Sequence, residues 1–311
     1  MAHIQRKLSY LAEAAAFKKL KAQRAARSVR DLAHFNSTDA SWMFCTPLAR
    51  FRLSSLQLRI RIRRQLNLDI PSCMNITLGK GALRVPADAK GDFALSVFGN
   101  KSAWNALHNA LRDALISFAK QAGLPAEPEK DRLLDGDDGE ISMARPADAF
   151  VEGQHGWKAA EGRRLWIDIT TISAVCASHA ALCAKEIGGG AAWAANQKKI
   201  KYHAQMAARG WPGYLLPIAF ESEGFVQKEL SQLLTVWSKL WADNGGYTMD
   251  DAKQRQQIWA NELALIHAKY LAQAILDNSK YAREACAVGK GAHNRSPLLS
   301  DNDEARPWGS G

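Results

Sequence analysis

Cysteine is scarce in this sequence and is not arranged in pairs. The 311 residues include five cysteines, which are Cys45, Cys73, Cys176, Cys183 and Cys286. An odd number at wide spacing predicts neither a disulfide framework nor a paired Cys-x-x-Cys zinc site, so reduced thiols are expected. Cys176, His179 and Cys183 are metal-capable side chains at short spacing, but no fourth ligand follows nearby. We therefore expect no zinc.

Long hydrophobic runs are also absent. No stretch reaches the roughly eighteen apolar residues that a membrane helix needs. The opening residues 1–27 have neither the apolar block nor the cleavage site of a secretory signal. These absences predict an intracellular protein with no membrane partner. The compartment that we expect is the nucleus, with an organelle as the alternative. At 47% hydrophobic residues the chain still suffices for a sizeable core.

Three motifs that would assign a function are missing. The segment GKGAL lacks the spacing of a phosphate-binding loop, and LLDGDDGE lacks a glycine and a distal glutamate at the offsets of a calcium-binding loop. No aromatic-x-Asp-Asp sequence is present, and 311 residues leave no room for the fingers and palm of a polymerase. Nucleotide hydrolysis, calcium binding of this type and reverse transcription are therefore not expected of the chain.

Positive charge, by contrast, is abundant and unevenly placed. Lysine and arginine outnumber aspartate and glutamate by 41 to 31, a formal net charge of +10. Much of it lies in residues 1–69, where an alanine-rich opening favours a helix and residues 50–66 fit either a strand or a helix. This basic, mainly helical arm is either a solvated helix face or a surface that contacts phosphates. The second alternative would use Arg59, Arg61, Arg63 and Arg64, and DNA or RNA would be the partner.

The rest of the chain divides by pattern into four segments. Residues 70–101 are rich in turn-forming residues, 102–226 alternate between helix-like and strand-like runs, 227–287 form two amphipathic helices, and 288–311 have the composition of a disordered tail. Within 102–226 the order is a helix, an uncertain short strand, two strands joined as a hairpin, a basic helix and a last strand. The sequence therefore predicts an α+β fold with an αβββαβ core.

Two aspartates lie within the hairpin strands. Asp148 follows RPA, and Asp168 lies inside the apolar run RRLWIDITTI, where an alternating pattern places it on one face with Trp166 and Thr170. The following helix carries Lys198, Lys201 and Tyr202 on neighbouring positions of one face. Paired carboxylates hold Mg²⁺ or Mn²⁺, and a lysine orients or deprotonates the attacking water, in metal-dependent phosphodiesterases.

Successive motifs in this order resemble a known domain. RPADAFV, LWIDITTISAV, AANQKKIKYHAQM and LLPIAFESEG are similar to the restriction-enzyme-like endonuclease domain found in the C-terminal region of non-LTR retrotransposon reverse transcriptases. This domain is a branch of the PD-(D/E)XK superfamily. The resemblance covers roughly residues 40–275, and it implies a restriction-endonuclease-like fold, DNA cleavage and a divalent metal ion.

The resemblance implies roles for individual residues. Asp148 corresponds to the acid of the PD element, and Asp168 to the second metal-binding acid, with the Ile169 carbonyl as a further ligand. Thr170 stands where the superfamily usually has lysine, and in this branch the helix supplies that lysine. Lys198 is therefore slightly preferred to Lys201 as the catalytic lysine. The resemblance also implies that Lys201 and Tyr202 contact the scissile phosphate and that Arg145 binds nucleic acid. Glu221 matches an acid after the last strand whose role is unassigned.

The sequence also departs from this family. Cys73 remains of the zinc knuckle that usually precedes the nuclease, but Phe93 and Val97 stand where a histidine and a cysteine are expected. His108 is a lone helical histidine, a type that is more often packed or capped than a ligand. Two hypotheses follow: a fragment, stand-alone descendant or remnant that cleaves DNA, or an inactive nucleic-acid-binding or scaffold subunit of a larger assembly.

Overall fold

The computed structural model describes residues 28–39, 41–45, 51–78, 85–96, 101–128, 147–153, 155–176, 179–208 and 213–287. The helices, with 3-10 helices written η, are α2 (Val29–Asn36), η1 (Ser41–Phe44), α3 (Ser55–Gln65), η3 (Pro71–Cys73), α4 (Asp92–Ser96), α5 (Lys101–Gln121), η5 (Lys158–Ala160), α6 (Ala180–Lys185), α7 (Gly189–Ala208), α8 (Lys228–Gly245) and α9 (Met249–Ala287). The strands are β1 (Thr77–Leu78), β2 (Val85–Pro86), β3 (Ala126–Pro128), β4 (Ala149–Val151), β5 (Arg164–Ile172) and β6 (Gly213–Glu221). The predictions for residues 1–27, for Arg145 and for 288–311 lie outside the described residues.

The main sheet has four strands in the order β3-β4-β5-β6. β3, β4 and β5 pair antiparallel, whereas β5 and β6 pair parallel across a crossover that contains α6 and α7. The described chain from α5 to β6 thus runs helix, three strands, helices and a strand. The α+β prediction is confirmed, and so are the hairpin and the uncertain first strand.

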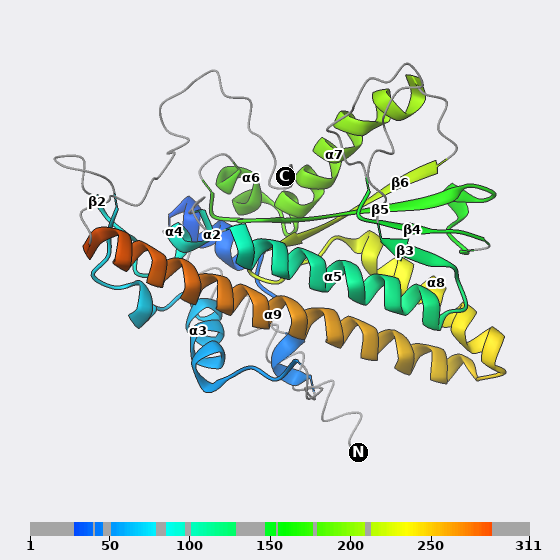
Figure 1. Cartoon of the computed structure of the whole chain (residues 1–311), viewed down its shortest axis with the longest axis horizontal. Coiled ribbons are helices and arrows are strands. Elements are labelled where there is room, and N and C mark those ends of the chain that lie inside the picture. The colour runs from blue at the N-terminus through cyan, green and yellow to red at the C-terminus, as the bar shows by residue number, and fades with distance from the viewer. Residues whose placement is uncertain are drawn as a thin grey trace.

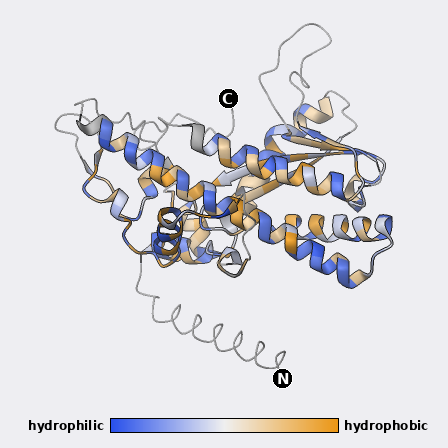
Figure 2. Cartoon of the chain, turned by 60° about the horizontal axis from the view of Figure 1, so that its bottom comes forward, coloured by the Kyte–Doolittle hydropathy of each residue, from blue (hydrophilic) through white to orange (hydrophobic). Residues whose placement is uncertain are grey.

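Helices cover both faces of this sheet (Figure 1). On one face Leu165, Ile167 and Ile169 of β5 pack with residues of α5, α8 and α9 in the largest hydrophobic cluster. On the other face Trp166 packs with Tyr202 of α7. Because period-two alternation sends odd and even residues of β5 to opposite faces, Asp168 points with Trp166 toward α7. In Figure 2 the strands are coloured mostly as hydrophobic, while the long helices carry both colours.

The two predicted C-terminal helices are present as α8 and α9. They are separated at Gly246, whose φ of +67° lies in the left-handed region that favours glycine. Trp237 of α8 and Trp259 of α9 are buried in the large cluster, and Trp259 stacks on Phe118 of α5 with ring centroids 5.1 Å apart. Figure 1 shows α9 running alongside α5 beneath the sheet. Within the described residues, no helix is both long and apolar enough to cross a membrane.

The ambiguous basic run is a helix. Ser54 caps α3 by accepting from the Gln57 backbone N–H at 3.2 Å, and the Gln57 side chain accepts from the Ser54 N–H at 2.8 Å. This reciprocal capping box favours a helix over a strand. The helix packs against α9, and α2 packs against α6. The described part of the predicted arm is therefore integrated into the body of the protein.

The remnant of the zinc knuckle is apolar. Cys73 is buried, with its Sγ 3.2 Å from the Ser279 Oγ of α9, and Phe93 is buried in the same cluster as Ile70 and Leu271. The structure therefore packs this region through side chains of α4 and α9. Val97 lies outside the described residues.

Candidate active site

The two aspartates meet where β4 and β5 pair. Ala149 is opposite Ile167, so Asp148 and Asp168 occupy the adjoining positions on neighbouring strands. The Asp148 backbone N–H donates to the Ile167 carbonyl at 2.8 Å, and the Ile169 N–H donates to Asp148 Oδ2 at 2.5 Å. These bonds fix the Asp148 carboxylate against β5. They also give Ile169 a contact with Asp148 through its N–H.

Asp168 is an acid held in an apolar interior. Its residue is 2% exposed, and burial, reinforced by the charge of Asp148, raises its pKa to about 7. One oxygen, Oδ1, accepts from Lys198 Nζ at 3.1 Å. The other, Oδ2, is buried and has no hydrogen-bond partner among the described residues. A buried carboxylate oxygen without a donor is costly, so this atom requires an explanation.

Lys198 is the lysine that the structure brings to the acids. It is buried on α7, and although burial disfavours its charge, the Asp168 carboxylate raises its pKa above the usual value. Lys201 is exposed, with its Nζ 4.9 Å from the Tyr202 ring centroid, and burial together with the charge of Lys198 lowers its pKa. Tyr202 is buried among Phe150, Trp166 and Met206. The sequence-based preference for Lys198 over Lys201 therefore agrees with the geometry at Asp168.

A fourth group at the site is His108, for which the sequence favoured a packed or capped role. It lies on α5 with its Nε2 2.9 Å from Asp148 Oδ1. Burial opposes its charge, but the hydrogen bond and the charge of Asp148 raise its pKa above the usual value. The sequence signal was its position directly after Leu107 of the apolar stripe, which directs it to the edge of the buried face of α5.

Glu221 lies away from the two aspartates. In the parallel pairing it is opposite Ile172, four residues beyond Asp168, or roughly 13 Å along the strand. It is buried, burial raises its pKa, and its Oε1 accepts from the Ala191 N–H at 2.7 Å. A Cβ at Gly190 would lie 2.9 Å from this oxygen and 2.8 Å from Ile172 Cδ1. Glu221 thus anchors the start of α7.

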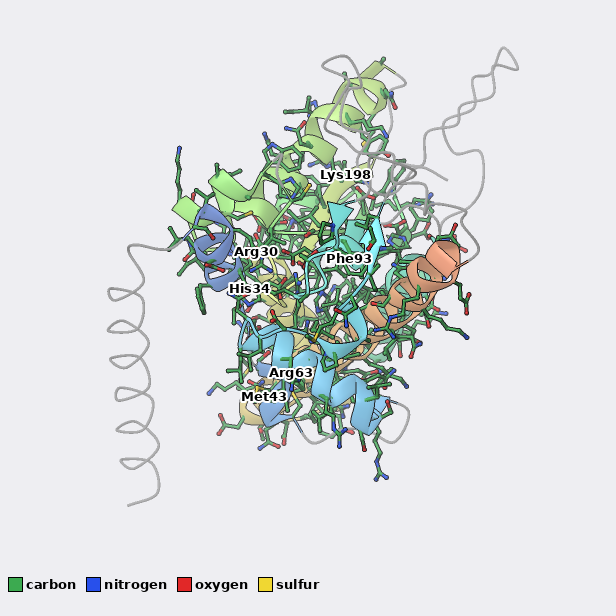
Figure 3. All side chains as sticks on the ribbon, turned by 90° about the vertical axis from the view of Figure 1, so that its left-hand side faces the viewer. Arg30, His34, Met43, Arg63, Phe93 and Lys198 are labelled. Carbon is green, nitrogen blue, oxygen red and sulfur yellow. The ribbon has the colours of Figure 1, made fainter. Side chains whose placement is uncertain are left out.

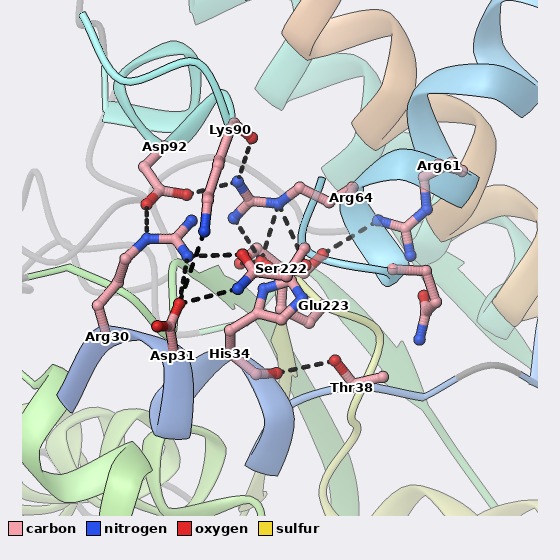
Figure 4. Close-up of polar contacts among 12 residues, drawn as sticks. Arg30, Asp31, His34, Thr38, Arg61, Arg64, Lys90, Asp92, Ser222 and Glu223 are labelled. Carbon is pink, nitrogen blue, oxygen red and sulfur yellow. Dashed lines mark hydrogen bonds and ion pairs between the residues drawn. The ribbon is translucent and has the colours of Figure 1, made fainter. Parts of the chain in front are cut away.

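The predicted nucleic-acid contacts on α3 need correction. Arg61 and Arg64 are fully buried, whereas Arg59 and Arg63 are exposed. Arg64 donates to Glu223 from Nε at 3.0 Å, to Asp92 at 2.5 Å and to the Lys90 carbonyl at 2.8 Å (Figure 4). The prediction is wrong for Arg61 and Arg64, because partners from distant parts of the chain draw both guanidinium groups inside.

The buried network joins several elements and lies apart from the aspartates. Arg61 donates to the Ser222 carbonyl at 3.4 Å, and its guanidinium lies 5.6 Å from the Trp42 ring centroid. Burial lowers its pKa to about 10. Figure 3 labels Arg63, on the same helix, and Lys198 at well-separated places on the molecule. The exposed arginines of α3 and the aspartates therefore occupy different regions.

The carboxylate oxygens of the two aspartates suit a divalent cation, although His108 and Lys198 already contact one oxygen of each acid. Within the described ranges no three His, Cys, Asp or Glu side chains are arranged to hold a metal ion. His108 contacts Asp148 Oδ1, and Lys198 contacts Asp168 Oδ1. None of the described residues donates a hydrogen bond to Asp168 Oδ2. Carboxylate oxygens are the ligands that Mg²⁺ and Mn²⁺ prefer, so the residues fit such an ion.

The second metal-capable group is arranged differently. His179 Nε2 contacts the Ser173 carbonyl oxygen at 2.5 Å, and its ring stacks on Trp193. Cys183 is buried, and burial raises the pKa of its thiol to about 12. Cys183 packs with Ala33 of α2 and with Ala174, which follows β5.

Comparisons with protein-family models, with curated proteins and with solved structures found no match to this chain.

Proposed function

We propose that this protein is a metal-dependent endonuclease that cleaves phosphodiester bonds of DNA, built on a restriction-endonuclease-like core. The observation that carries the proposal is the buried Asp168 Oδ2 atom beside Asp148 and Lys198, to which none of the described residues donates a hydrogen bond. An oxygen in this state is suited to a cation. The strand order and the helix that supplies Lys198 support the same proposal, because the sequence motifs resemble those of the retroelement nucleases.

In this proposal each residue of the cluster has a separate role in catalysis. Asp148 and Asp168 would hold a divalent cation, which when bound supplies Lewis-acid stabilisation of negative charge on the phosphate. The charge of Lys198 favours the ionised form of Asp168, against the burial that raises the pKa of this acid to about 7, and Lys198 would orient the attacking water. The exposed Lys201 would contact the phosphate, and the ring of buried Tyr202 packs against the ammonium groups of both lysines.

Substrate would approach from the side of Asp148. The Asp148 side chain is 16% exposed and that of His108 is 33% exposed, whereas those of Asp168 and Lys198 are nearly sealed. The exposed Arg59 and Arg63 would add contacts to the DNA backbone that carry no sequence information.

Plasmid nicking tests the proposal. Wild-type protein is incubated with supercoiled DNA and Mg²⁺ or Mn²⁺, and Asp168→Asn is compared with Asp113→Asn. Asp113 is an exposed acid on α5 and serves as the matched control. We expect nicking by wild type and by Asp113→Asn, and none by Asp168→Asn. Equal nicking by all three, or by none, would overturn the catalytic assignment.

A second candidate function is an inactive nucleic-acid-binding or scaffold subunit of a larger assembly. The ion pair between Lys198 and Asp168 favours it, because a buried lysine already neutralises the acid. If DNA binding is retained by wild type and by Asp168→Asn while neither nicks the plasmid, this second candidate is correct.

A further inference from the structure

A cavity of about 120 Å³ lies between α8, α9, η1 and the end of β6. It is on the face of the sheet away from α7, where Figure 1 shows α8 and α9. Trp42, Phe220, Leu234 and Leu263 line the cavity, and all four are buried. The walls are therefore largely apolar and include two aromatic rings.

His267 of α9 adds a polar ring to these walls. The residue lines the cavity and is 3% exposed, and its Nε2 is buried with no hydrogen-bond partner among the described residues. A buried polar atom in this state is costly unless a ligand or an ordered water supplies a partner. The ring stacks on Phe220. Because the torsion that turns a histidine ring has a broad minimum, a small rotation would present Nε2 to a group in the cavity.

The charges around the cavity favour an uncharged ligand. Burial lowers the pKa of His267 to about 3, so its imidazole is neutral, and the positive charge of Arg61 that acts on it would also repel a cation. Asp39 lines the cavity, where its carboxylate accepts from the Ser41 backbone N–H at 2.8 Å, and it would repel an anion. A hydroxyl group suits a neutral imidazole, because it can donate to Nε2 or accept from it, whichever ring nitrogen carries the proton.

The size and the rings of the cavity suit one aromatic ring. An apolar cavity of roughly 150 Å³ engineered into another protein binds benzene. The present cavity is slightly smaller, but Ser41 and Ser231 at its edge are exposed, so part of a ligand can extend toward solvent. Trp42 and Phe220 can pack against a planar ligand in offset or edge-to-face arrangements.

We propose that this cavity binds an uncharged single-ring aromatic alcohol, whose ring packs against Trp42 and Phe220 and whose hydroxyl group pairs with His267 Nε2. The site is separate from the proposed endonuclease site. Phe220 packs with the residues of β5 that face α5, whereas Asp168 points with Trp166 toward α7.

Nuclear magnetic resonance titration with phenol and with benzene tests the site. The protein is labelled with ¹⁵N at its tryptophans, and the indole N–H signal of Trp42 is assigned by its absence from Trp42→Phe. We expect both compounds to shift this signal until it saturates, because Trp42 lines the cavity. A wild-type signal that responds to neither compound would overturn the inference, since the cavity would then admit no such ring.

The variant His267→Phe removes the polar atom and keeps a ring. Its affinity for phenol should fall about fivefold relative to its affinity for benzene, which is the usual net effect of one neutral hydrogen bond. A purely structural role of His267 would change the binding of both compounds alike. An equal change for phenol and benzene would therefore overturn the pairing of the hydroxyl group with His267.

Filling the cavity tests where the compounds bind. Ala264→Leu enlarges a side chain of α9 that lines the cavity, and Gln257→Leu makes a comparable change at an exposed position of the same helix. We expect Ala264→Leu to lose both compounds and Gln257→Leu to bind them as wild type does. Ala260→Leu, at a second lining position, takes the place of Ala264→Leu if circular dichroism shows that the first variant is unfolded. Binding as tight as that of wild type in a folded cavity-filling variant would overturn the inference, because the compounds would then lie elsewhere.

Discussion

Because Lys198 and Asp168 are both buried, neither side chain can lose its partner without cost to the fold. Both side chains are almost fully covered, and Nζ lies 3.1 Å from Oδ1. Removing one partner of such a pair leaves an uncompensated charge in the interior, whereas replacing both costs much less. Losing either partner alone should therefore destabilise the fold, and the contact with Lys198 fixes the position of Asp168 Oδ1.

A double-mutant cycle measures the coupling free energy between Lys198 and Asp168. Lys198→Met should lower the free energy of unfolding by about 3 kcal/mol, because Asp168 would be left buried and unpaired. The double variant Lys198→Met with Asp168→Leu should recover most of that loss. Urea denaturation of the wild type, both single variants and the double variant gives the coupling. Additive losses in the two single variants would show that the pair is not coupled as the structure indicates.

Residues also explain what the sequence could and could not predict. Asp168 was expected to be buried because apolar residues flank it on both sides, and Lys198 was expected beside it from helical spacing. Arg61 and Arg64 were assigned to the surface, since arginine is rarely buried without partners. The partner of Arg64 is Glu223, 159 positions away, and that of Arg61 is the Ser222 carbonyl, 161 positions away, too far for any local pattern to indicate. His108 was missed because a single histidine carries no pattern.

At the scale of elements, α9 ties the N-terminal helices to the sheet. His267 of α9 is buried and stacks on Phe220 of β6, with ring centroids 5.9 Å apart. Its Nε2 has no hydrogen-bond partner among the described residues. Burial lowers the pKa of His267 to about 3; the charge of Arg61 on α3 acts in the same direction, and that of Glu223 opposes it. The packing of α9 on α3 and β6 thus requires a neutral imidazole.

This requirement predicts a pH dependence of stability. The folded protein keeps His267 neutral down to about pH 3, while the unfolded chain takes up a proton below its ordinary pKa of 6.5. Between these values the unfolded state binds one more proton, so His267 lowers stability by about 1.4 kcal/mol per pH unit as the pH falls. Chemical denaturation at pH 7, 6 and 5 should show a shallower acid loss for His267→Phe than for wild type. Parallel pH profiles would contradict the assignment.

The predictability of elements followed their local patterns. The hairpin, β6 and the two C-terminal helices have strong periodicity and were predicted. The start of α7 at Gly189 was not, because glycines disfavour helices on their own. Tertiary packing overrides that preference, since Gly190 must lie against Cys183, Ile172 and Glu221 without a side chain between them.

At the scale of the whole molecule, charged residues gather in two separate clusters, one that joins helices and one at the aspartates. The network of Arg64, Glu223 and Asp92 joins α2, α3, α4 and the end of β6, and Arg64 donates to both of its acids (Figure 4). In the cluster of Asp148, Asp168 and Lys198, the described residues leave one acceptor of Asp168 without a donor, and Asp148 is partly accessible to solvent. We therefore place the proposed cation at the second cluster.

Diffraction from a crystal grown with Mn²⁺ tests this central claim most directly. We expect an anomalous difference peak between the carboxylates of Asp148 and Asp168, within about 2.5 Å of an oxygen of each. The Lys198 ammonium should remain on Asp168 Oδ1. A structure from such a crystal with no peak between the two aspartates would contradict the claim that they share a divalent cation.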